Sequence, residues 1–591
     1  MQPILGLPGR IHIFDTKPTT AAALIVALGL AALMGGILAV VVFRPLRRSS
    51  PLARVVASLG LLLYFIAIID LRFPAQGATG LTIRPLLPTT VIDLGSVRLP
   101  ADRIWLAVLG ALAAGALWLA MHHTPFGLRT RAVAENERGA NLLGISADRI
   151  AIANWIIAAV LSTGALILSA PVTRLNATST SLLVVPAIAA ALVARFTSVP
   201  IALVAGLTIG MAQSELQNLR LRWDWLPQVN LQQGVPVVVV LGVLARRGRG
   251  LPGRGDLAPV QLPSATLPRR AEAIVVAATV VGIVGILAAS SVWRTGIIVS
   301  AIGAITALSV IVATGFVGQI SLATSAFAGI AAFSLVKFGD GLPFPLAALL
   351  ASVVSVVVGV VVGLPALRVR GMTLAMATLA GAIAVESLVF EWSWFTGGVE
   401  GTTVASPKLG SWDLGISAVG DAYPRRTFGV VAVVIAGLAV LMVTRLRRST
   451  TARRWLAVRD NERAAAGLGL SVASIKLGAF AVSAFLAGLA GTLTAYQRQT
   501  LSVRSFDSFS AVAIIAFAYL AGIANPLGAV VAGVLAGGGV LTVALGQSAS
   551  RYQFAVNGVL LVVAAIVLPE GIAGRLSRSR RQASIAVPSR S

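Results

Sequence analysis

The chain has no cysteine and is poor in charged residues, histidine and lysine. Of its 591 residues, 12% are charged and 57% are hydrophobic. Without cysteine, disulfides and thiolate metal sites are excluded, and His12, His122 and His123 do not have metal-ligand spacing. We therefore expect no metal site and no bound cofactor. A soluble protein carries about 25% charged residues, so the shortage of charge indicates a membrane protein.

Long apolar runs fill most of the sequence. One example is TAAALIVALGLAALMGGILAVVVF at residues 20–43, and about 20 apolar residues allow a helix to cross a bilayer. The runs are continuously apolar and do not alternate, which argues against the strands of a β-barrel. The predicted fold class is an all-α polytopic membrane protein with about 17 spans, seven before residue 247 and ten after residue 270.

Positive charge is abundant and is carried almost entirely by arginine. The formal net charge is +26, whereas lysine occurs only at positions 17, 337, 408 and 476. The basic residues occupy the gaps between apolar runs, as the positive-inside rule predicts for cytoplasmic loops. We therefore expect no nucleic-acid partner. Attraction to anionic membrane lipid is an additional consequence.

The arginine-rich gaps predict the orientation in a plasma or inner cell membrane. The gaps expected on the cytoplasmic side are residues 44–49, 122–149, 245–270, 445–463 and 575–581. Two gaps of mixed charge, 72–102 and 393–426, are expected outside. This alternation starts the chain outside and ends it inside.

One segment without an apolar run divides the chain. Residues 245–270 read ARRGRGLPGRGDLAPVQLPSATLPRR, a composition typical of a solvated linker. The predicted organisation is a first membrane half, a cytoplasmic linker, a second membrane half and a basic cytoplasmic tail, at residues 1–245, 246–270, 271–575 and 576–591.

The two halves share a polar segment. Residues 132–146 read AVAENERGANLLGIS and residues 457–471 read AVRDNERAAAGLGLS, with nine of fifteen positions identical and no gap. The order of the flanking apolar runs also matches, which indicates a tandem duplication. Because both copies have the same predicted orientation, the halves form a parallel repeat. Three runs of the second half (271–291, 294–317 and 323–338) have no counterpart, so we expect the first half to be shortened at its start.

The repeated segment has helical features. Residues 129–143 favour a short helix, which Gly144 closes in a left-handed conformation, and Ser146 can cap the next helix. Val133, Ala140 and Leu143 fall on one stripe, and the second copy repeats it. The alanine predicts a thin ridge that fits a groove on a partner. The alternative is a solvated connector, which does not require the same asparagine, alanine and glycine in both copies.

Several motifs resemble one family, the permease subunits of ABC importers for branched-chain amino acids. The second half resembles the M-type subunit and the first half the H-type subunit, fused in one chain. The motifs are GFVGQISLATSAF (315–327), LPALRVRGMTLAMATLAGAIAVE (364–386), TGGVEGTTVASP (396–407), PEGIAG (569–574), RPLRRSSPLARVVASLGL (44–61) and PFGLRTRAVAENERGANLLGIS (125–146). Ala323 and Thr324 stand where the M-type pattern usually has Gly-His.

The resemblance implies a function for the repeated segments. In this family they are coupling helices that dock on two ABC ATPase subunits, while an extracytoplasmic binding protein delivers the substrate. The substrates are branched-chain amino acids or relatives such as urea and short amides. The implied coupling residues are Glu135, Asn136, Glu137, Ala140, Gly144, Asp460, Asn461, Glu462, Ala465 and Gly469.

The chain itself has no ATPase motif. A P-loop requires Gly-Lys followed by Ser or Thr, and none of the lysines is followed by either residue. We therefore expect a non-enzymatic translocation subunit whose ATP is hydrolysed by partner subunits. Polar residues in apolar runs are candidates for a substrate path; they are Gln319, Ser321, Thr324, Thr378 and Glu386. For Glu386 the simpler interpretation is a carboxylate at the outer end of a span.

Two other functions are compatible with the sequence. An ion-coupled secondary transporter also uses internal repeats, but it requires buried carboxylates or broken helices for the coupling ion. A membrane scaffold without transport activity is the second alternative. Dependence of uptake on ATP, and not on a proton gradient, separates the ABC importer from the first alternative.

Overall fold

The computed structural model describes most of the chain. The described residues are 20–49, 51–72, 85–94, 97–173, 177–220, 222–223, 231–246, 267–366, 372–398, 400–417, 423–506, 508–550 and 552–567. Most of the predicted linker, the motif at 569–574 and the predicted tail at 576–591 lie outside the described residues.

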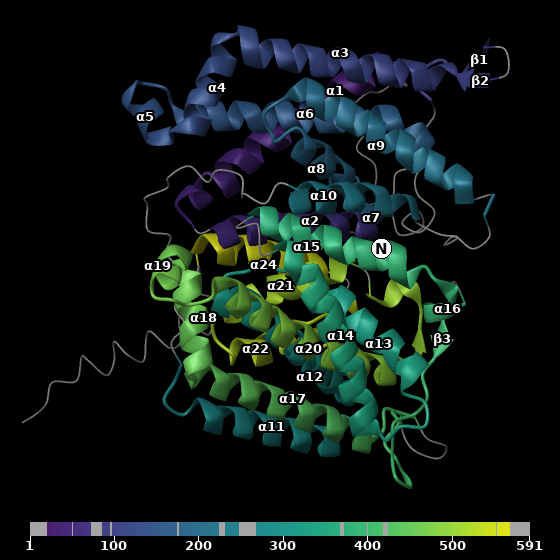
Figure 1. The fold of residues 1–591 in the computed structure, drawn as a ribbon, viewed down its shortest axis with the longest axis vertical. Coiled ribbons are helices and arrows are strands. Elements are labelled where there is room, and N and C mark those ends of the chain that lie inside the picture. Colours follow the sequence, from purple (N-terminus) through teal and green to yellow (C-terminus); the bar gives the residue numbers. More distant parts are fainter. Residues whose placement is uncertain are drawn as a thin grey trace, which may run out of the picture. The chain divides into compact units, whose positions relative to one another are not determined.

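Helices dominate the described residues (Figure 1). Ten of them are long and apolar enough to cross a membrane, and six shorter apolar helices of 10–17 residues accompany them. This confirms the predicted all-α polytopic class. The total of about 17 spans stays a prediction.

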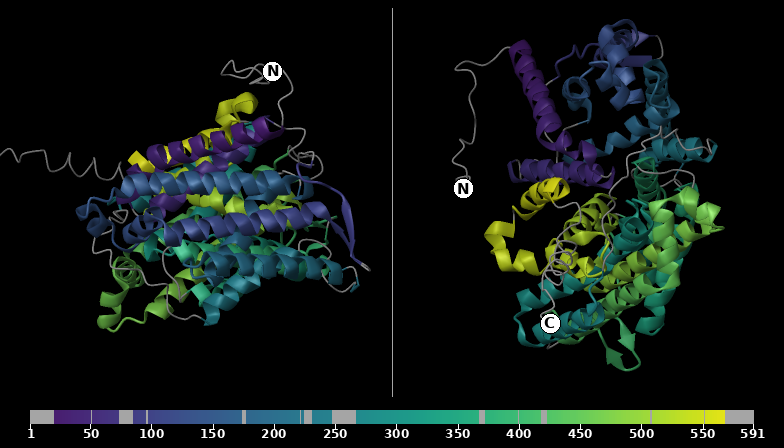
Figure 2. Two further views of the ribbon diagram at one scale, coloured as in Figure 1. Left: turned by 90° about the horizontal axis from the view of Figure 1, so that it is seen from above. Right: turned by 90° about the vertical axis from the view of Figure 1, so that its left-hand side faces the viewer.

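The described chain separates into two compact units. Unit 1 spans residues 1–45 and 76–176, and unit 2 spans 46–75 and 177–591. The elements of unit 1 are α1 (Thr20–Ile37), the π-helical turn η1 (Leu38–Phe43), β1 (Val91–Leu94), β2 (Val97–Pro100), α3 (Ala101–His123), α4 (Pro125–Glu135), α5 (Glu137–Leu142) and α6 (Ala147–Thr173). The antiparallel pair β1–β2 precedes α3 (Figure 2), and η2 (Pro45–Arg48) connects the units.

Unit 2 contains helices from both halves of the sequence. From the first half come α2 (Pro51–Arg72), α7 (Ala177–Leu182), α8 (Val184–Val193), α9 (Val199–Arg220), η3 (Leu231–Gln233) and α10 (Gly234–Arg246). From the second half come α11 (Ala271–Ala288), α12 (Ser291–Val310), η4 (Ile311–Phe316), α13 (Thr324–Phe338), α14 (Phe344–Ala366), α15 (Met372–Val385), η5 (Glu386–Phe390), α16 (Ser393–Thr396), α17 (Arg426–Arg448), α18 (Thr450–Asp460), α19 (Glu462–Gly467), α20 (Val472–Arg498), η6 (Val503–Phe506), α21 (Ser508–Gly522), α22 (Gly528–Leu535), α23 (Val540–Ser550) and α24 (Gln553–Val567).

Short antiparallel strands connect some of these helices. They are β3 (Thr402–Thr403) with β6 (Thr500–Leu501), and β4 (Lys408–Leu409) with β5 (Trp412–Asp413). The glycine-rich segment before β3 turns through Gly397, Gly398 and Gly401, whose φ angles are +77°, +66° and +77°. Glycine adopts this left-handed region without steric cost, which explains the sequence TGGVEG.

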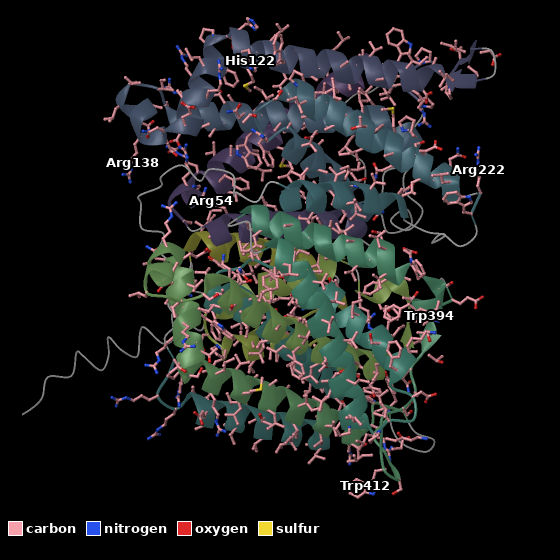
Figure 3. All side chains as sticks on the ribbon, viewed as in Figure 1. Arg54, His122, Arg138, Arg222, Trp394 and Trp412 are labelled. Carbon is pink, nitrogen blue, oxygen red and sulfur yellow. The ribbon has the colours of Figure 1, made fainter. Side chains whose placement is uncertain are left out.

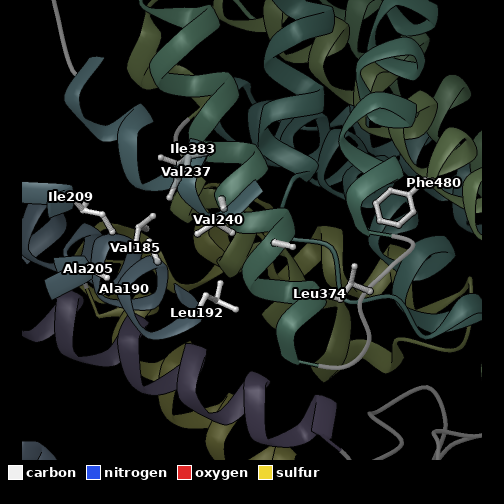
Figure 4. Close-up of a cluster of buried hydrophobic side chains, with 13 residues drawn as sticks. Val185, Ala190, Leu192, Ala205, Ile209, Val237, Val240, Leu374, Ile383 and Phe480 are labelled. Atoms are coloured by element: carbon white, nitrogen blue, oxygen red, sulfur yellow. The ribbon is translucent and has the colours of Figure 1, made fainter. Parts of the chain in front are cut away.

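The core of unit 2 joins the two halves of the sequence. First-half α2 packs against second-half α24, and first-half α10 packs against second-half α15. Figure 4 shows the buried apolar cluster of α8, α9, α10 and α15 with Phe480 of α20. Its members are Val185, Ala189, Ala190, Leu192, Ala205, Ile209, Val237, Val240, Leu374, Ala377, Ala380, Ile383 and Phe480.

Equivalent helices pack in equivalent ways in the two units. In unit 1, α1 approaches α6 closely at Gly35, where a Cβ would lie 2.8 Å from the Cβ of Ala159. In unit 2, α14 approaches α20 at Gly359, where a Cβ would overlap the Cβ of Ala484. Glycine permits both helix pairs to approach closely, as small residues do between membrane helices.

Candidate functional site

Each copy of the repeated segment folds as two short helices separated by asparagine. In the first copy, Asn136 has φ −151° and ψ 97° between α4 and α5, and its Oδ1 accepts a hydrogen bond from the N–H of Gly139 at 2.9 Å. Asparagine at this position satisfies an N–H group that the first turn of α5 leaves without a helical partner. In the second copy, Asn461 has φ −156° and ψ 102°, and its Oδ1 accepts from Arg463 at 3.0 Å and Ala464 at 3.1 Å.

The prediction of one helix over residues 129–143 was therefore wrong at Asn136. The segment contains good helix formers, but an asparagine side chain competes with the helical backbone for hydrogen bonds. The break redirects the chain, so that α5 does not continue the periodicity of α4.

A glycine closes α5 and α19 in the same way. Gly144 and Gly469 both have φ +78°, as the sequence predicts. The N–H of Ile145 donates to Ala140 O at 3.0 Å, and the N–H of Leu470 donates to Ala465 O at 3.1 Å. These six-to-one bonds, with the left-handed glycine, form the Schellman motif. Ser146 also caps α6 weakly, since the N–H of Arg149 lies 3.5 Å from its Oγ.

The predicted alanine ridge is not on the surface. Ala140 and Ala465 are buried, whereas Leu143 and Leu468 are each 80% exposed. The stripe was counted through the break at asparagine, which rotates the second helix relative to the first. The exposed apolar group of each loop is therefore the leucine before the closing glycine; in the first copy Leu142 is exposed beside it.

The acidic residues of the loops lie at the helix breaks. Glu137 and Glu462 occupy the first turns of α5 and α19, where a negative charge is favourable next to the positive end of the helix dipole. Glu462 Oε1 also lies 2.8 Å from Lys476 Nζ of α20. Glu135 ends α4 and Asp460 ends α18. The exposed Arg138 side chain extends away from α5 (Figure 3).

We expect the two asparagine caps to stabilise the loop helices directly. Changing Asn136 or Asn461 to alanine removes the acceptor and costs about 1 kcal/mol of local stability. Hydrogen exchange of the amides of residues 137–142 and 462–467 measures this loss. The aspartate variants keep the acceptor and should retain the protection; equal protection in the alanine variants would contradict the capping role.

A second group of polar residues lies at a break between η4 and α13. Residues 317–323 separate η4 from α13; the backbone is not helical from Gly318 to Ala323, and all seven residues except Gly318 are buried. Thr314 Oγ1 donates to Gln319 O at 3.0 Å, and Thr378 Oγ1 of α15 accepts from the N–H of Leu322 at 3.0 Å. Non-helical backbone at membrane depth occurs where it is enclosed by protein or lines a cavity.

Gln319 is the least satisfied side chain of this group. It is 2% exposed, and neither its Oε1 nor its Nε2 has a hydrogen-bond partner among the described residues. Ser321 and Thr324 are buried in the same segment. The structure thus brings Gln319, Ser321, Thr324 and Thr378 together.

Glu386 lies apart from the other four predicted path residues. It begins η5 and is partly exposed. Eight residues of helix separate it from Thr378, which corresponds to about 12 Å along the axis. This position agrees with the simpler interpretation of Glu386 as a carboxylate near the end of its span.

A second interruption of helical structure, which was not predicted from the sequence, lies near this site. Between α21 and α22, residues 523–527 are not helical, and Gly522 has φ +121°. Asn525 is buried, and its Oδ1 accepts from the N–H of Leu527 at 3.1 Å. The sequence signal for this break was Pro526. A proline also follows the first repeated segment, at Pro200. Within the described residues, no group of three or more His, Cys, Asp or Glu is arranged to hold a metal ion.

Comparison with known proteins identifies the family. The model of the family described as branched-chain amino acid transport system / permease component matches residues 8–244 and again residues 293–565. One similar protein is the high-affinity branched-chain amino acid transport system permease protein LivM of Salmonella typhimurium, 32% identical over 279 residues. The protein of the same name from Escherichia coli is 30% identical over 279 residues.

The relatives and the family model match different fractions of the chain. Each match to the two relatives covers 44% of this chain and 65% of the relative. No solved structure matches the chain. The family model covers most of the chain in two consecutive matches, as a fused duplication requires. The chain is a multi-pass membrane protein, and it belongs to the family of permease components of branched-chain amino acid transport systems.

Proposed function

We propose that the chain is the translocation subunit of an ABC importer. It receives a branched-chain amino acid, or a related small amide or urea, from an extracytoplasmic binding protein. Two separate ATPase subunits on the cytoplasmic side drive the transport. The name shared by the two relatives, a branched-chain amino acid transport permease, supports this substrate class.

The duplicated loop is the observation that carries the proposal. Both copies have an asparagine-capped short helix, a left-handed glycine at φ +78° and a leucine that is 80% exposed before that glycine. An exposed leucine on a rigid helix end is an apolar anchor for a partner. Two equal anchors fit two equal partners. The proposed coupling residues of the two loops are Glu135, Asn136, Glu137, Ala140, Gly144, Asp460, Asn461, Glu462, Ala465 and Gly469.

One observation supports a second candidate, an ion-coupled secondary transporter. The breaks at residues 317–323 and 523–527 resemble the discontinuous helices in which such transporters bind their ions. Among the described residues, however, no aspartate or glutamate is fully buried. A coupling ion at either break would therefore lack the carboxylate that such sites commonly use, so this candidate is the weaker one.

Uptake into proteoliposomes in which the cytoplasmic face of the chain points to the lumen tests the proposed function. The chain is reconstituted with its ATPase subunits and the binding protein is added outside. We expect leucine uptake that requires enclosed ATP and is unaffected by a protonophore. Uptake that a protonophore abolishes and ATP does not support would favour the secondary transporter. Absence of uptake under both conditions would favour a scaffold without transport activity.

We propose that the buried polar group around Gln319 contacts the substrate during translocation. An unpaired buried amide costs stability, and its retention calls for a functional explanation; we infer that the explanation here is a ligand. Ser321, Thr324 and Thr378 extend the polar surface around it. Glu386, nearer the end of its span, would act at the outer end of the path.

Changing Gln319 to leucine should lower uptake without lowering the stability of the protein. Removal of an unpaired amide should leave the thermal stability equal or higher by about 1 kcal/mol, while uptake should fall about tenfold because a ligand hydrogen bond is lost. Thr378→Val should in contrast lower the thermal stability, because Thr378 bonds to the backbone of the break. Normal uptake by Gln319→Leu would remove Gln319 from the path.

A further inference from the structure

One arginine connects the second repeated loop to the broken helix. Arg459 lies near the end of α18, two residues before the capping Asn461, and its side chain is 8% exposed. Its Nη1 donates a hydrogen bond of 2.7 Å to the carbonyl oxygen of Gly315, which is 144 residues away in sequence. A Cβ built on Gly318 would lie 3.0 Å from Arg459 Cγ. The side chain therefore contacts both sides of the start of the break.

The carbonyl that Arg459 binds belongs to the end of the π-helical turn η4. The last carbonyls of a helix have no helical partner, and a positive charge is favourable at this end of the helix dipole. A hydrogen bond from a charged donor is roughly twice as strong as a neutral one. Arg459 thus holds the point at which η4 ends and the segment 317–323 begins.

The same glycine also contacts the second break. A Cβ on Gly315 would overlap the carbonyl oxygen of Ile523 and lie 3.3 Å from Cα of Ala524. The backbone at Gly315 is therefore packed directly on the backbone of residues 523–524. A movement of Arg459 would act on both breaks through this one glycine.

A second attachment joins the same loop to a membrane helix. Glu462 Oε1 of α19 lies 2.8 Å from Nζ of Lys476, and the Lys476 side chain is buried in α20. This ion pair fixes the short helix α19 to the first turns of α20. The loop of the second half is consequently attached at both of its helices, by Arg459 on α18 and by Glu462 on α19.

The first loop cannot make these two attachments. At the alignment of Asn136 with Asn461, Ala134 corresponds to Arg459 and Ala151 corresponds to Lys476. An alanine side chain has neither a donor nor a charge. The two loops are thus alike in their caps and exposed leucines, but unlike in how they are attached to the membrane helices.

We propose that the two loops have unequal roles: the second loop transmits ATPase movement through Arg459 to the breaks at 317–323 and 523–527, and the first loop serves mainly to hold its ATPase. Arg459 is a positioning residue in this scheme. The inference rests on the proposed function, since it requires ATPase subunits on both loops. Beyond that function, it assigns the opening of the path to movement of the second half of the chain.

The experiment compares three variants in the reconstituted importer with both ATPases and the binding protein. Arg459→Ala removes the donor, Arg459→Lys keeps the charge and one donor group, and Arg454→Ala removes an exposed arginine of the same helix. For each, we measure ATPase subunits retained on purification, ATP hydrolysed, and leucine taken up per ATP.

We expect Arg459→Ala to retain both ATPase subunits and to hydrolyse ATP, while uptake per ATP falls about tenfold, within the usual range of coupling between sites. Arg459→Lys should recover part of the lost uptake, and Arg454→Ala should resemble the wild type. Unchanged uptake per ATP in Arg459→Ala would overturn the proposal. So would a loss of uptake that only follows a loss of bound ATPase, since Arg459 would then merely support the loop. If the wild type itself retains no ATPase, the proposed function is wrong, and this is visible without any variant.

Discussion

The double variant Leu143→Arg/Leu468→Arg is expected to lose both ATPase subunits and all ATP-driven uptake. Each leucine is 80% exposed in the chain alone, so its replacement leaves the loop fold intact. Burial of a leucine in a partner contributes about 1.5–3 kcal/mol, and an arginine in the same groove adds the cost of an unpaired buried charge. The measurement is co-purification of the ATPases from detergent-solubilised membranes, with uptake measured in parallel.

The control for this variant is Arg129→Ala/Arg454→Ala. These two residues occupy equivalent exposed positions on α4 and α18, away from the leucines. We expect the control to retain both ATPases. Retention of both subunits by the leucine variant would show that the leucines are not the anchors. Arginine at Ala140 or Ala465 is a poorer test, because those side chains are buried and the substitution would disrupt the loop itself.

The second large effect is expected for Gly315→Ala. The added methyl group would overlap the carbonyl oxygen of Ile523, and backbone atoms cannot move aside as the end of a side chain can. Overpacking of this kind costs about 1–3 kcal/mol or more. The substitution should lower the melting temperature in detergent and reduce uptake severely, because both breaks meet at this glycine.

Gly478→Ala is the matched control for Gly315→Ala. Gly478 lies in α20, and a Cβ there would have no heavy atom within 4 Å. Alanine is favoured over glycine inside a helix by about 1 kcal/mol, so we expect unchanged or slightly higher stability. A wild-type melting temperature for Gly315→Ala would mean that the two breaks do not pack closely in the membrane.

Local chemistry made the loop partly predictable from sequence. The left-handed glycines at 144 and 469 were predicted correctly, because glycine is the residue that adopts this conformation without cost. The break at Asn136 was missed, although the asparagine shared by both copies was the signal. Counting the helical stripe through that break then placed the alanines on the surface beside the leucines, whereas only the leucines are exposed.

Contacts between distant segments were not accessible from sequence. The bond from Arg459 to Gly315 spans 144 residues, and periodicity along one helix carries no information about such a partner. The packing of α2 on α24 and of α10 on α15 likewise joins the two halves of the sequence in one core. The burial of Gln319 was anticipated from its apolar neighbours, but its lack of a hydrogen-bond partner among the described residues was not.

The most direct test of the central claim counts ATPase subunits by native mass spectrometry in the absence of nucleotide. The wild type should carry two ATPases, the single variants Leu143→Arg and Leu468→Arg one each, and the double variant none. This result requires each loop to hold one subunit. Two ATPases on either single variant, or none on the wild type, would contradict the assignment of the duplicated loops as the two docking points.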